Sequence, residues 1–198
     1  LGSWTDYTTF RRLDVHGIAE AIDGSNSAGI MTLSSYEDAG FYGAYQDNDF
    51  HDNAPGGIKQ YSQEKLLWED NLFRDSGGGP DLKADVHRFE VRNCLFRNDV
   101  TATCGLFGNM NFGIPESGEG GEASGEIRYN LMLCAGGSAQ EVNQDSMAGR
   151  IDLYRNTFVG HVTVRAAAAD DGPFNFSRNV IVNDETGTDH VSFYESDT

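Results

Sequence analysis

The feature that most constrains the fold of this chain is a short motif around asparagine that returns at nearly constant intervals. Its copies are Asp47-Asn48-Asp49-Phe50, Asp70-Asn71-Leu72-Phe73, Arg92-Asn93-Cys94-Leu95-Phe96, Tyr129-Asn130-Leu131-Met132, Arg155-Asn156-Thr157-Phe158 and Arg178-Asn179-Val180-Ile181. The steps from one asparagine to the next are 23, 22, 37, 26 and 23 residues. A fixed period in this range indicates a chain built from stacked repeats, and the longest step predicts an insertion.

Short strands are predicted on both sides of the motif. Before it, apolar and polar residues alternate, as in Phe89-Glu90-Val91, Ile151-Asp152-Leu153 and Phe174-Asn175-Phe176, which is the period of a strand with one buried face. A second strand-like segment follows, with copies at Gly29-Ile30-Met31-Thr32, Gly57-Ile58-Lys59-Gln60, Asp81-Leu82-Lys83-Ala84 and Gly105-Leu106-Phe107-Gly108. Residues 13–18 are predicted to form an earlier turn with His16 in the asparagine place. The prediction is an all-β solenoid of about seven coils, each of about 23 residues.

Asparagine suits the sharp turn that must join two short strands. It tolerates the left-handed backbone conformation, and its amide hydrogen-bonds nearby backbone groups. In stacked coils the amides would form a ladder, each donating to the next, while the apolar residue beyond points inward and stacks on its copies. A helical fold is excluded because 24 glycines interrupt every long segment. The Leu-x-x-Leu-x-Leu pattern of leucine-rich repeats is absent.

With a Val/Ile-x-x-Asn-x-Phe motif at steps of about 23 residues, the chain resembles the pectate-lyase-like superfamily of right-handed parallel β-helices. The resemblance runs from Phe10 to Phe193 and implies one right-handed β-helix domain over residues 1–198. It implies little about function, because such repeats occur in lyases, hydrolases, epimerases, phage tailspikes and non-catalytic surface proteins. Lyases of the superfamily carry Arg or Lys beside carboxylate metal ligands on successive coils, and this sequence matches only fragments of that pattern.

The chain is strongly acidic, with a net charge of −17 and a pI near 4.4. Acidity argues against nucleic acid or an anionic membrane as a partner, since both need clustered Lys and Arg. Membrane insertion is not expected, because no apolar run approaches the roughly 20 residues that cross a bilayer. The composition suits an extracellular or cell-surface protein. The chain has neither an initiator Met nor a signal peptide, and we expect it to be a piece of a longer protein or assembly.

Three cysteines, Cys94, Cys104 and Cys134, are too few and too scattered for a disulfide framework or a zinc site. Cys94 and Cys134 are predicted to be small buried hydrophobic residues. One disulfide to Cys104 stays open as an alternative.

The candidate catalytic residues lie in the strand that follows the motif. Aligning its copies places Lys59 and Lys83 outward and one coil apart, with about 5 Å between their backbones. Two ammonium groups this close disfavour each other's protonation and lower a pKa toward the range of a base. With Tyr61 and Asp85 in the adjacent column, these side chains would suit cleavage of a uronate, with cations for the sugar carboxylate and a base for the C5 proton. The alternative is a solvated surface on which Asp81 and Asp85 pair with Lys83.

Two long interruptions of the period, residues 34–44 and 100–125, are predicted to be loop insertions beside this face. The candidate substrate-binding residues are Phe107, Asn109, Arg88, His161 and Arg165. For Arg88 the alternative is a surface row of ion pairs with Glu90 and Arg92. For His161 and Arg165, no acidic partner follows from the spacing.

No cofactor is assigned with certainty, and a Ca²⁺ ion is the one metal that the residues suggest. Asp47, Asp49 and Asp52 surround the first clear copy of the motif and provide the oxygen ligands that Ca²⁺ prefers. The Asp-x-Asp-x-Asp-Gly loop that would make the site specific is missing.

Two functions therefore remain open. The first is an extracellular, carbohydrate-associated β-helix, a polysaccharide lyase or hydrolase acting on an acidic polysaccharide. The second is a non-catalytic structural or adhesive β-helix of a cell surface, extracellular filament or phage tailspike. Open coil ends invite edge-to-edge pairing, so self-association or neighbouring capping domains are expected partners in the second case.

Overall fold

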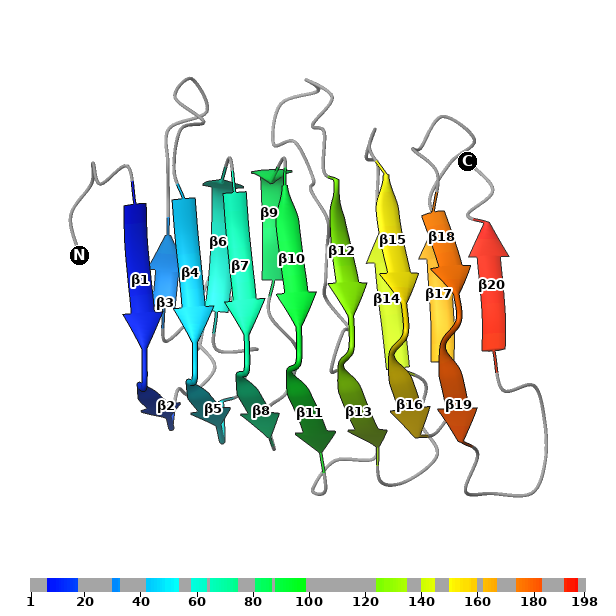
Figure 1. Ribbon diagram of the computed structural model, residues 1–198, viewed down its shortest axis with the longest axis horizontal. Coiled ribbons are helices and arrows are strands. Elements are labelled where there is room, and N and C mark those ends of the chain that lie inside the picture. The colour runs from blue at the N-terminus through cyan, green and yellow to red at the C-terminus, as the bar shows by residue number, and fades with distance from the viewer. Residues whose placement is uncertain are drawn as a thin grey trace, which may run out of the picture.

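The computed structural model describes residues 7–17, 30–32, 42–53, 58–63, 65–74, 81–86, 88–98, 124–134, 140–144, 150–159, 162–166, 174–182 and 191–195. Every regular element in these residues is a β-strand, and every strand pair is parallel. The strands form two sheets of seven strands and two sheets of three. This arrangement confirms the all-β prediction and supports a parallel, repeating solenoid (Figure 1).

The first sheet contains the strands that precede the turn, and the second contains those that follow it. In spatial order the first sheet is β1 (Tyr7–Arg11), β4 (Tyr42–Gln46), β7 (Lys65–Glu69), β10 (Phe89–Arg92), β12 (Gly125–Arg128), β15 (Ile151–Tyr154) and β18 (Phe174–Ser177). The second sheet is β2 (Asp14–His16), β5 (Asp49–His51), β8 (Leu72–Arg74), β11 (Leu95–Asn98), β13 (Leu131–Cys134), β16 (Thr157–Val159) and β19 (Val180–Val182). Seven strands in each sheet agree with the predicted number of coils.

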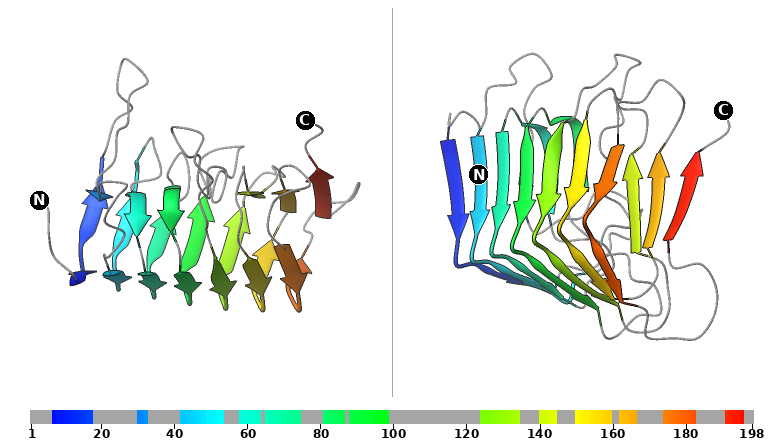
Figure 2. Two further views of the ribbon diagram at one scale, coloured as in Figure 1. Left: turned by 90° about the horizontal axis from the view of Figure 1, so that it is seen from above. Right: turned by 45° about the vertical axis from the view of Figure 1, so that its right-hand side comes forward.

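The remaining strands lie on the opposite side of the stack, as the two turned views show (Figure 2). One small sheet contains β3 (Ile30–Thr32), β6 (Ile58–Gln63) and β9 (Asp81–Val86). The other contains β14 (Gln140–Gln144), β17 (Val162–Ala166) and β20 (Val191–Glu195). Both predicted loop insertions end inside strands, because residues 42–44 belong to β4 and Gly125 begins β12. Apart from Ser124, the rest of the two insertions lies outside the described residues.

A two-residue turn connects each strand of the first sheet to the next strand of the second. The first residue of the turn has a positive φ in every coil: Arg12, Asp47, Asp70, Asn93, Tyr129, Arg155 and Arg178, with φ from 54 to 58°. The second residue is the ladder position. The left-handed conformation is therefore adopted by the residue before the ladder asparagine, and the prediction that the asparagine itself adopts it is wrong.

The asparagine ladder is present, with two corrections to its register. Asn48 donates its Nδ2 to Oδ1 of Asn71 at 2.9 Å. Further along, Asn130 donates to Asn156 at 3.0 Å, and Asn156 donates to Asn179 at 3.1 Å. Each of these amides also donates to a backbone carbonyl of a neighbouring coil. The ladder asparagines thus satisfy one another, and Asn48, Asn71, Asn130 and Asn156 are almost completely buried, whereas Asn179 is partly exposed.

The corrections concern two coils that lack asparagine at the ladder position. Cys94, rather than Asn93, is the ladder residue of its coil, and its backbone N–H donates to Oδ1 of Asn130 at 2.9 Å. Leu13, rather than His16, holds the ladder position of the first coil, and its N–H donates to Oδ1 of Asn48. Residue type misled the alignment in both coils, whereas the constant two-residue turn defines the position.

Cys94 is a buried, free thiol, as its predicted role as a small buried residue required. Asn71 directs Nδ2 at its Sγ from 3.9 Å, where the other rungs have a carboxamide oxygen. Burial raises the pKa of the thiol to about 12, so the thiolate that oxidation requires is scarce. The disulfide to Cys104 is not formed by Cys94, and Cys104 itself lies outside the described residues.

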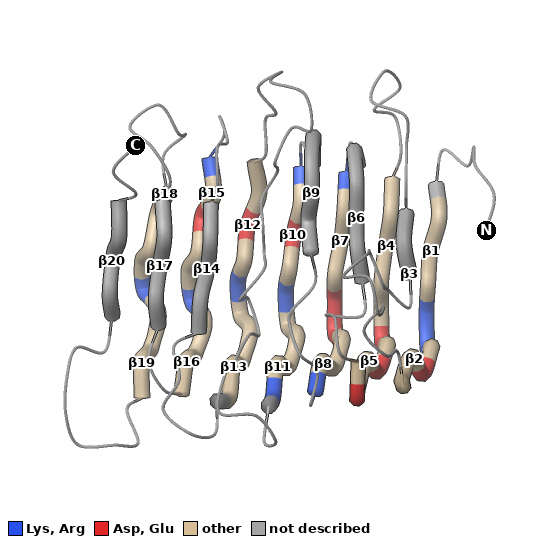
Figure 3. The backbone as a smooth tube through the Cα atoms, turned by 180° about the vertical axis from the view of Figure 1, so that it is seen from behind, with Lys and Arg blue, Asp and Glu red and all other residues tan. Residues whose placement is uncertain are grey.

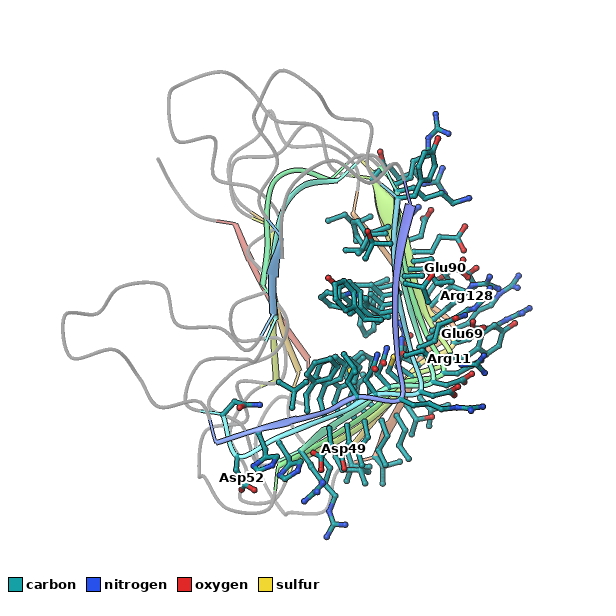
Figure 4. All side chains as sticks on the ribbon, turned by 90° about the vertical axis from the view of Figure 1, so that its left-hand side faces the viewer. Arg11, Asp49, Asp52, Glu69, Glu90 and Arg128 are labelled. Atoms are coloured by element: carbon teal, nitrogen blue, oxygen red, sulfur yellow. The ribbon has the colours of Figure 1, made fainter. Side chains whose placement is uncertain are left out.

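Apolar side chains fill the interior in stacks that run along the solenoid (Figure 4). The rings of Phe50 and Phe73 stack at 5.0 Å, and those of Phe73 and Phe96 at 4.8 Å. These contacts confirm the predicted inward aromatic column. Gly125 sits in the column of Phe89, where an added Cβ would come within 2.4 Å of the Phe89 ring.

No helix in the described part of the chain is long and apolar enough to cross a membrane.

Candidate functional site

The predicted catalytic face lies on β6 and β9, and its register differs from the alignment of the repeats. Lys59 pairs with Asp81, and Tyr61 pairs with Lys83. Lys59 and Lys83 are therefore out of step by two residues, which separates their Cα atoms by about 8 Å instead of about 5 Å. The expectation that Lys59 and Lys83 lie in adjacent register is therefore wrong. Asp85 lies in β9 beside a register shift between Tyr61 and Gln63.

The structure gives less about the predicted substrate-binding residues. Phe107, Asn109 and His161 lie outside the described residues. Arg165 lies in β17, where its backbone pairs with those of Asn143 and Tyr194. Arg88 is exposed just before β10.

The richest set of polar contacts lies on the outer face of the first sheet. In-register pairing places Glu90, Glu126 and Asp152 in one column, followed by Asn175. Two residues further along the strands, a second column contains Glu69, Arg92, Arg128 and Tyr154. We call these eight residues together with Arg150 the charged row; in Figure 3, basic (blue) and acidic (red) positions follow one another along the backbones of β10, β12 and β15.

Arg92 and Arg128 connect successive coils of the charged row. Arg92 donates Nε to Glu69 at 2.8 Å and Nη1 to Glu90 at 3.0 Å. Arg128 donates Nε to Glu90 at 3.0 Å, and the same Nε lies 3.3 Å from Oε2 of Glu126. Glu90 and Glu126 are neighbours in one column, where their like charges would repel, and the arginines beside them offset that repulsion. The predicted ion-pair row of Glu90 and Arg92 is confirmed, and it extends over more coils than the sequence suggested.

An open hollow of about 480 Å³ lies at the β12–β15–β18 end of the charged row. Its lining includes Glu126, Arg150, Asp152, Tyr154, Asn175 and Ser177. The hydroxyl of Tyr154 donates to Glu126 at 2.8 Å. Asp152 accepts from Nε of Arg150 at 2.9 Å and from Nδ2 of Asn175 at 2.6 Å.

The protonation states around the hollow follow from these contacts. Burial and the hydrogen bond to Glu126 raise the pKa of Tyr154, which keeps its hydroxyl protonated at neutral pH. Burial alone would raise the pKa of Asp152, but hydrogen bonds from Arg150 and Asn175 outweigh it and lower the pKa. The hollow therefore presents the neutral phenol of Tyr154, the ionised carboxylate of Asp152, the carboxylate of Glu126 and the guanidinium of Arg150, groups that bind polar and charged ligands.

Arginine is concentrated in this part of an acidic chain. Segments 88–93, 124–129, 150–155 and 174–178 contain six arginines and three carboxylates. The arginines are Arg88, Arg92, Arg128, Arg150, Arg155 and Arg178. An excess of positive charge on one face gives a local attraction for anions that the net charge of −17 does not reveal.

Sequence reasoning missed Glu126, Arg128, Arg150, Asp152 and Tyr154. The signal was available, because Glu90-x-Arg92 and Glu126-x-Arg128 occupy the same place in their repeats. Without knowing which coils are adjacent, however, each pair resembled ordinary surface charge.

The predicted Ca²⁺ ligands Asp47, Asp49 and Asp52 each contact a different partner. Asp47 pairs with Arg11 at 2.9 Å. Asp49 pairs with Arg74, and Asp52 contacts His51. On the second sheet, potential metal-ligand atoms of Asp49 lie close to those of Asp14 and His51.

No protein-family model matches this chain, and neither a curated protein nor a solved structure does.

Proposed function

We propose that the protein is an extracellular right-handed parallel β-helix of the pectate-lyase-like kind that binds an acidic polysaccharide along the outer side of β10, β12, β15 and β18 and the residues that flank these strands. The observation that carries this proposal is the excess of six arginines over three carboxylates in segments 88–93, 124–129, 150–155 and 174–178, since a chain of net charge −17 needs a local basic zone to bind a polyanion. The solenoid suits an extended polymer because its coils repeat the same binding positions along one axis.

The hollow is the proposed anchoring point for one sugar unit. Its volume of about 480 Å³ lies within the range of small-ligand sites. The side chain of Arg150 is 61% exposed, and its Nε and Nη2 donate hydrogen bonds to Asp152. Among the described residues its Nη1 has no acceptor, so this nitrogen is available for a uronate carboxylate. The Tyr154 hydroxyl and the Asn175 amide provide hydrogen-bonding groups for sugar hydroxyls.

Cleavage is a separate proposal with a separate readout. In the charged row, Glu90, Glu126 and Asp152 each have an arginine partner, which favours binding over base catalysis there. A lyase or hydrolase activity would therefore belong to the β6–β9 face, where Lys59, Tyr61, Lys83 and Asp85 lie.

The binding experiment measures retardation of the protein in native gels containing pectate, alginate, a glycosaminoglycan or neutral dextran. We expect retardation by at least one acidic polymer, loss of that retardation in Arg150→Gln, and weakening by salt. Arg11→Gln is the matched control, because Arg11 is an exposed, ion-paired arginine at the far end of the sheet. Equal behaviour of Arg150→Gln and Arg11→Gln would contradict the proposed site. DNA of equal charge tests whether the binding is general for polyanions.

Activity is tested on the same polymers by following the absorbance of unsaturated sugar ends, with and without Ca²⁺. New reducing ends without that absorbance would indicate hydrolysis. Binding without either product would support a carbohydrate-binding protein that does not cleave.

A structural or adhesive β-helix is the second candidate, and the topology of the first sheet favours it. Among the described residues, β1 and β18 are the outermost strands, and such edges pair readily with further strands. Sedimentation velocity over a range of concentrations tests this. Assembly without polysaccharide binding would favour the structural function.

A further inference from the structure

A second polar cluster lies on the outer side of β2 and β5, away from the charged row (Figure 4). In-register pairing places Asp14 beside Asp49 and His16 beside His51. The two imidazole rings stack with centroids 4.9 Å apart and planes 10° from parallel. Two adjacent coils therefore bring carboxylates and imidazoles to one place on the surface.

Three potential ligand atoms converge within this cluster. Nε2 of His51 lies 2.8 Å from Oδ1 of Asp14, and atoms of Asp14, Asp49 and His51 all lie within 4.8 Å of one another. A zinc-sized ion bonds nitrogen and oxygen at about 2.0 to 2.2 Å, so its ligand atoms lie about 3 to 4 Å apart. The observed spacing therefore needs only small side-chain adjustments to surround an ion.

The other nitrogen of His51 is oriented as in many metal-binding histidines. Nδ1 lies 2.7 Å from Oδ2 of Asp52. A histidine that binds a metal through one nitrogen commonly donates the other N–H to a carboxylate, which orients the ring. With Nδ1–H directed at Asp52, Nε2 faces Asp14, and a bound ion would take the place of the proton that Nε2 can donate to that carboxylate.

The surroundings suit a divalent ion. Arg74 donates to both oxygens of Asp49, at 3.2 and 3.1 Å, which holds that carboxylate in position. Three carboxylates, from Asp14, Asp49 and Asp52, lie around His51, against the single guanidinium of Arg74. An imidazole among the ligands favours a first-row transition ion such as Zn²⁺, whereas Ca²⁺ prefers oxygen alone.

We infer that Asp14, Asp49 and His51 form a binding site for a divalent transition-metal ion, with Asp52 orienting the histidine. The ion would join the first coil to the second. That role has a structural reason, because the first coil has Leu13 at the ladder position and contributes no side-chain carboxamide to the ladder. A metal bound across β2 and β5 would provide the cross-link that asparagine provides in most other coils.

The test uses the full chain after chelator treatment, titrated with ZnCl₂ by calorimetry. We expect one Zn²⁺ site that is lost, or weakened at least about tenfold, in His51→Gln and in Asp14→Asn, and weakened about 10- to 100-fold in Asp52→Asn. Asp47→Asn is the matched control, because Asp47 is in the same part of the chain and pairs with Arg11. The other four histidines are retained in every variant, so any Zn²⁺ binding by them is common to all.

A second measurement uses Co²⁺ in place of Zn²⁺, since its visible absorption reports nitrogen and oxygen ligands. We expect bands in the wild-type protein and in Asp47→Asn but not in His51→Gln. If His51→Gln does not fold, Asp14→Asn replaces it, because the Asp14 side chain is 67% exposed. The inference is overturned if the wild type binds no Zn²⁺, if Asp14→Asn binds it as tightly as the wild type, or if Ca²⁺ displaces Zn²⁺ at equal concentration.

Discussion

The two faces of the first sheet follow different rules although they belong to the same strands. On the inner face, the column Tyr45, Trp68, Val91, Ile127 and Leu153 is apolar and completely buried. On the outer face, one residue further along each strand, Gln46, Glu69, Arg92, Arg128 and Tyr154 have different charges and shapes. The inner column only has to fill space next to similar neighbours, whereas each outer residue must suit the specific residue of the next coil.

This difference teaches where the stability and the specificity of the molecule lie. The contacts between side chains of the inner face are buried and repeat from coil to coil, so each makes a large contribution to the free energy of unfolding. Outer ion pairs are half-exposed, and each contributes at most about 1 kcal/mol. The outer face is consequently free to vary, and a binding site can develop there at little cost to the fold.

The largest effect is expected from opening a hole in an aromatic stack. Phe96→Ala removes a fully buried ring that stacks on Phe73, and we expect a loss of about 3 to 5 kcal/mol in the free energy of unfolding. Arg97→Ala, at the neighbouring exposed position of β11, should cost less than about 1 kcal/mol. Urea unfolding followed by far-UV circular dichroism measures both. Similar losses in the two variants would remove the distinction between the faces.

The ladder should come next. Asn130→Ala removes the acceptor of the Cys94 N–H and the donor to Val91 and Asn156, leaving buried groups unpaired. We expect a loss of about 2 to 3 kcal/mol. Asn93→Ala tests the register, because Asn93 is exposed with φ 54° and should cost only about 1 kcal/mol for the left-handed backbone. A larger loss in Asn93→Ala than in Asn130→Ala would mean that Asn93 is the ladder residue.

A smaller effect, of opposite sign, is expected from completing the ladder. Cys94→Asn offers Asn71 a carboxamide oxygen in place of a sulfur 3.9 Å away, and we expect a gain of about 1 kcal/mol. Cys94→Ser is the comparison, since a hydroxyl cannot span both neighbours as an amide does. In the wild-type protein the thiol should resist alkylation until the protein unfolds, because its pKa is raised to about 12. Destabilisation by Cys94→Asn would show that the position is adapted to sulfur.

The smallest effect concerns charge and pH. Hydrogen bonds from Gln46 and Arg92 lower the pKa of Glu69 in the folded protein despite its partial burial. A lowered pKa stabilises the fold at pH values above the unfolded pKa, and this contribution is lost as the pH falls through the folded pKa. Stability should therefore decline less steeply below about pH 4.5 in Glu69→Gln, by under about 1 kcal/mol, than in the wild type. The cost of Asn130→Ala should not depend on pH over the same range, since the amides do not titrate.

Much of the fold could be predicted because it depends on short, local sequence patterns. Alternation marked β10, β15 and β18, and the recurring asparagine marked the turns. The errors arose where a residue type was taken for a position: His16 and Asn93 resemble ladder residues, but Leu13 and Cys94 hold those positions. Residue identity is a weak guide there, because the turn only requires two residues, the first with a positive φ.

The candidate site was harder to predict, since it depends on which coils are neighbours and by how many residues they are shifted. The shift of β9 against β6 separated Lys59 from Lys83, and it is decided by backbone pairing in a strand interrupted by a bulge. The insertion between Asn93 and Asn130 likewise hid the fact that Glu90 and Glu126 are adjacent. Sequence distance does not reveal such neighbours.

The amino-acid sequence was enough to establish a repeating, parallel, all-β chain with a buried asparagine and aromatic ladder, because periodicity and burial are properties of single segments. Only the tertiary structure could show that six arginines gather on one face of an acidic protein, and that Asp14, Asp49 and His51 meet across two coils. Electrostatic attraction and ligand geometry act between side chains that are close in space. Asp14 and His51 lie 37 positions apart in the chain, and Glu90 and Arg128 lie 38 apart, and the stacking of the coils brings them together.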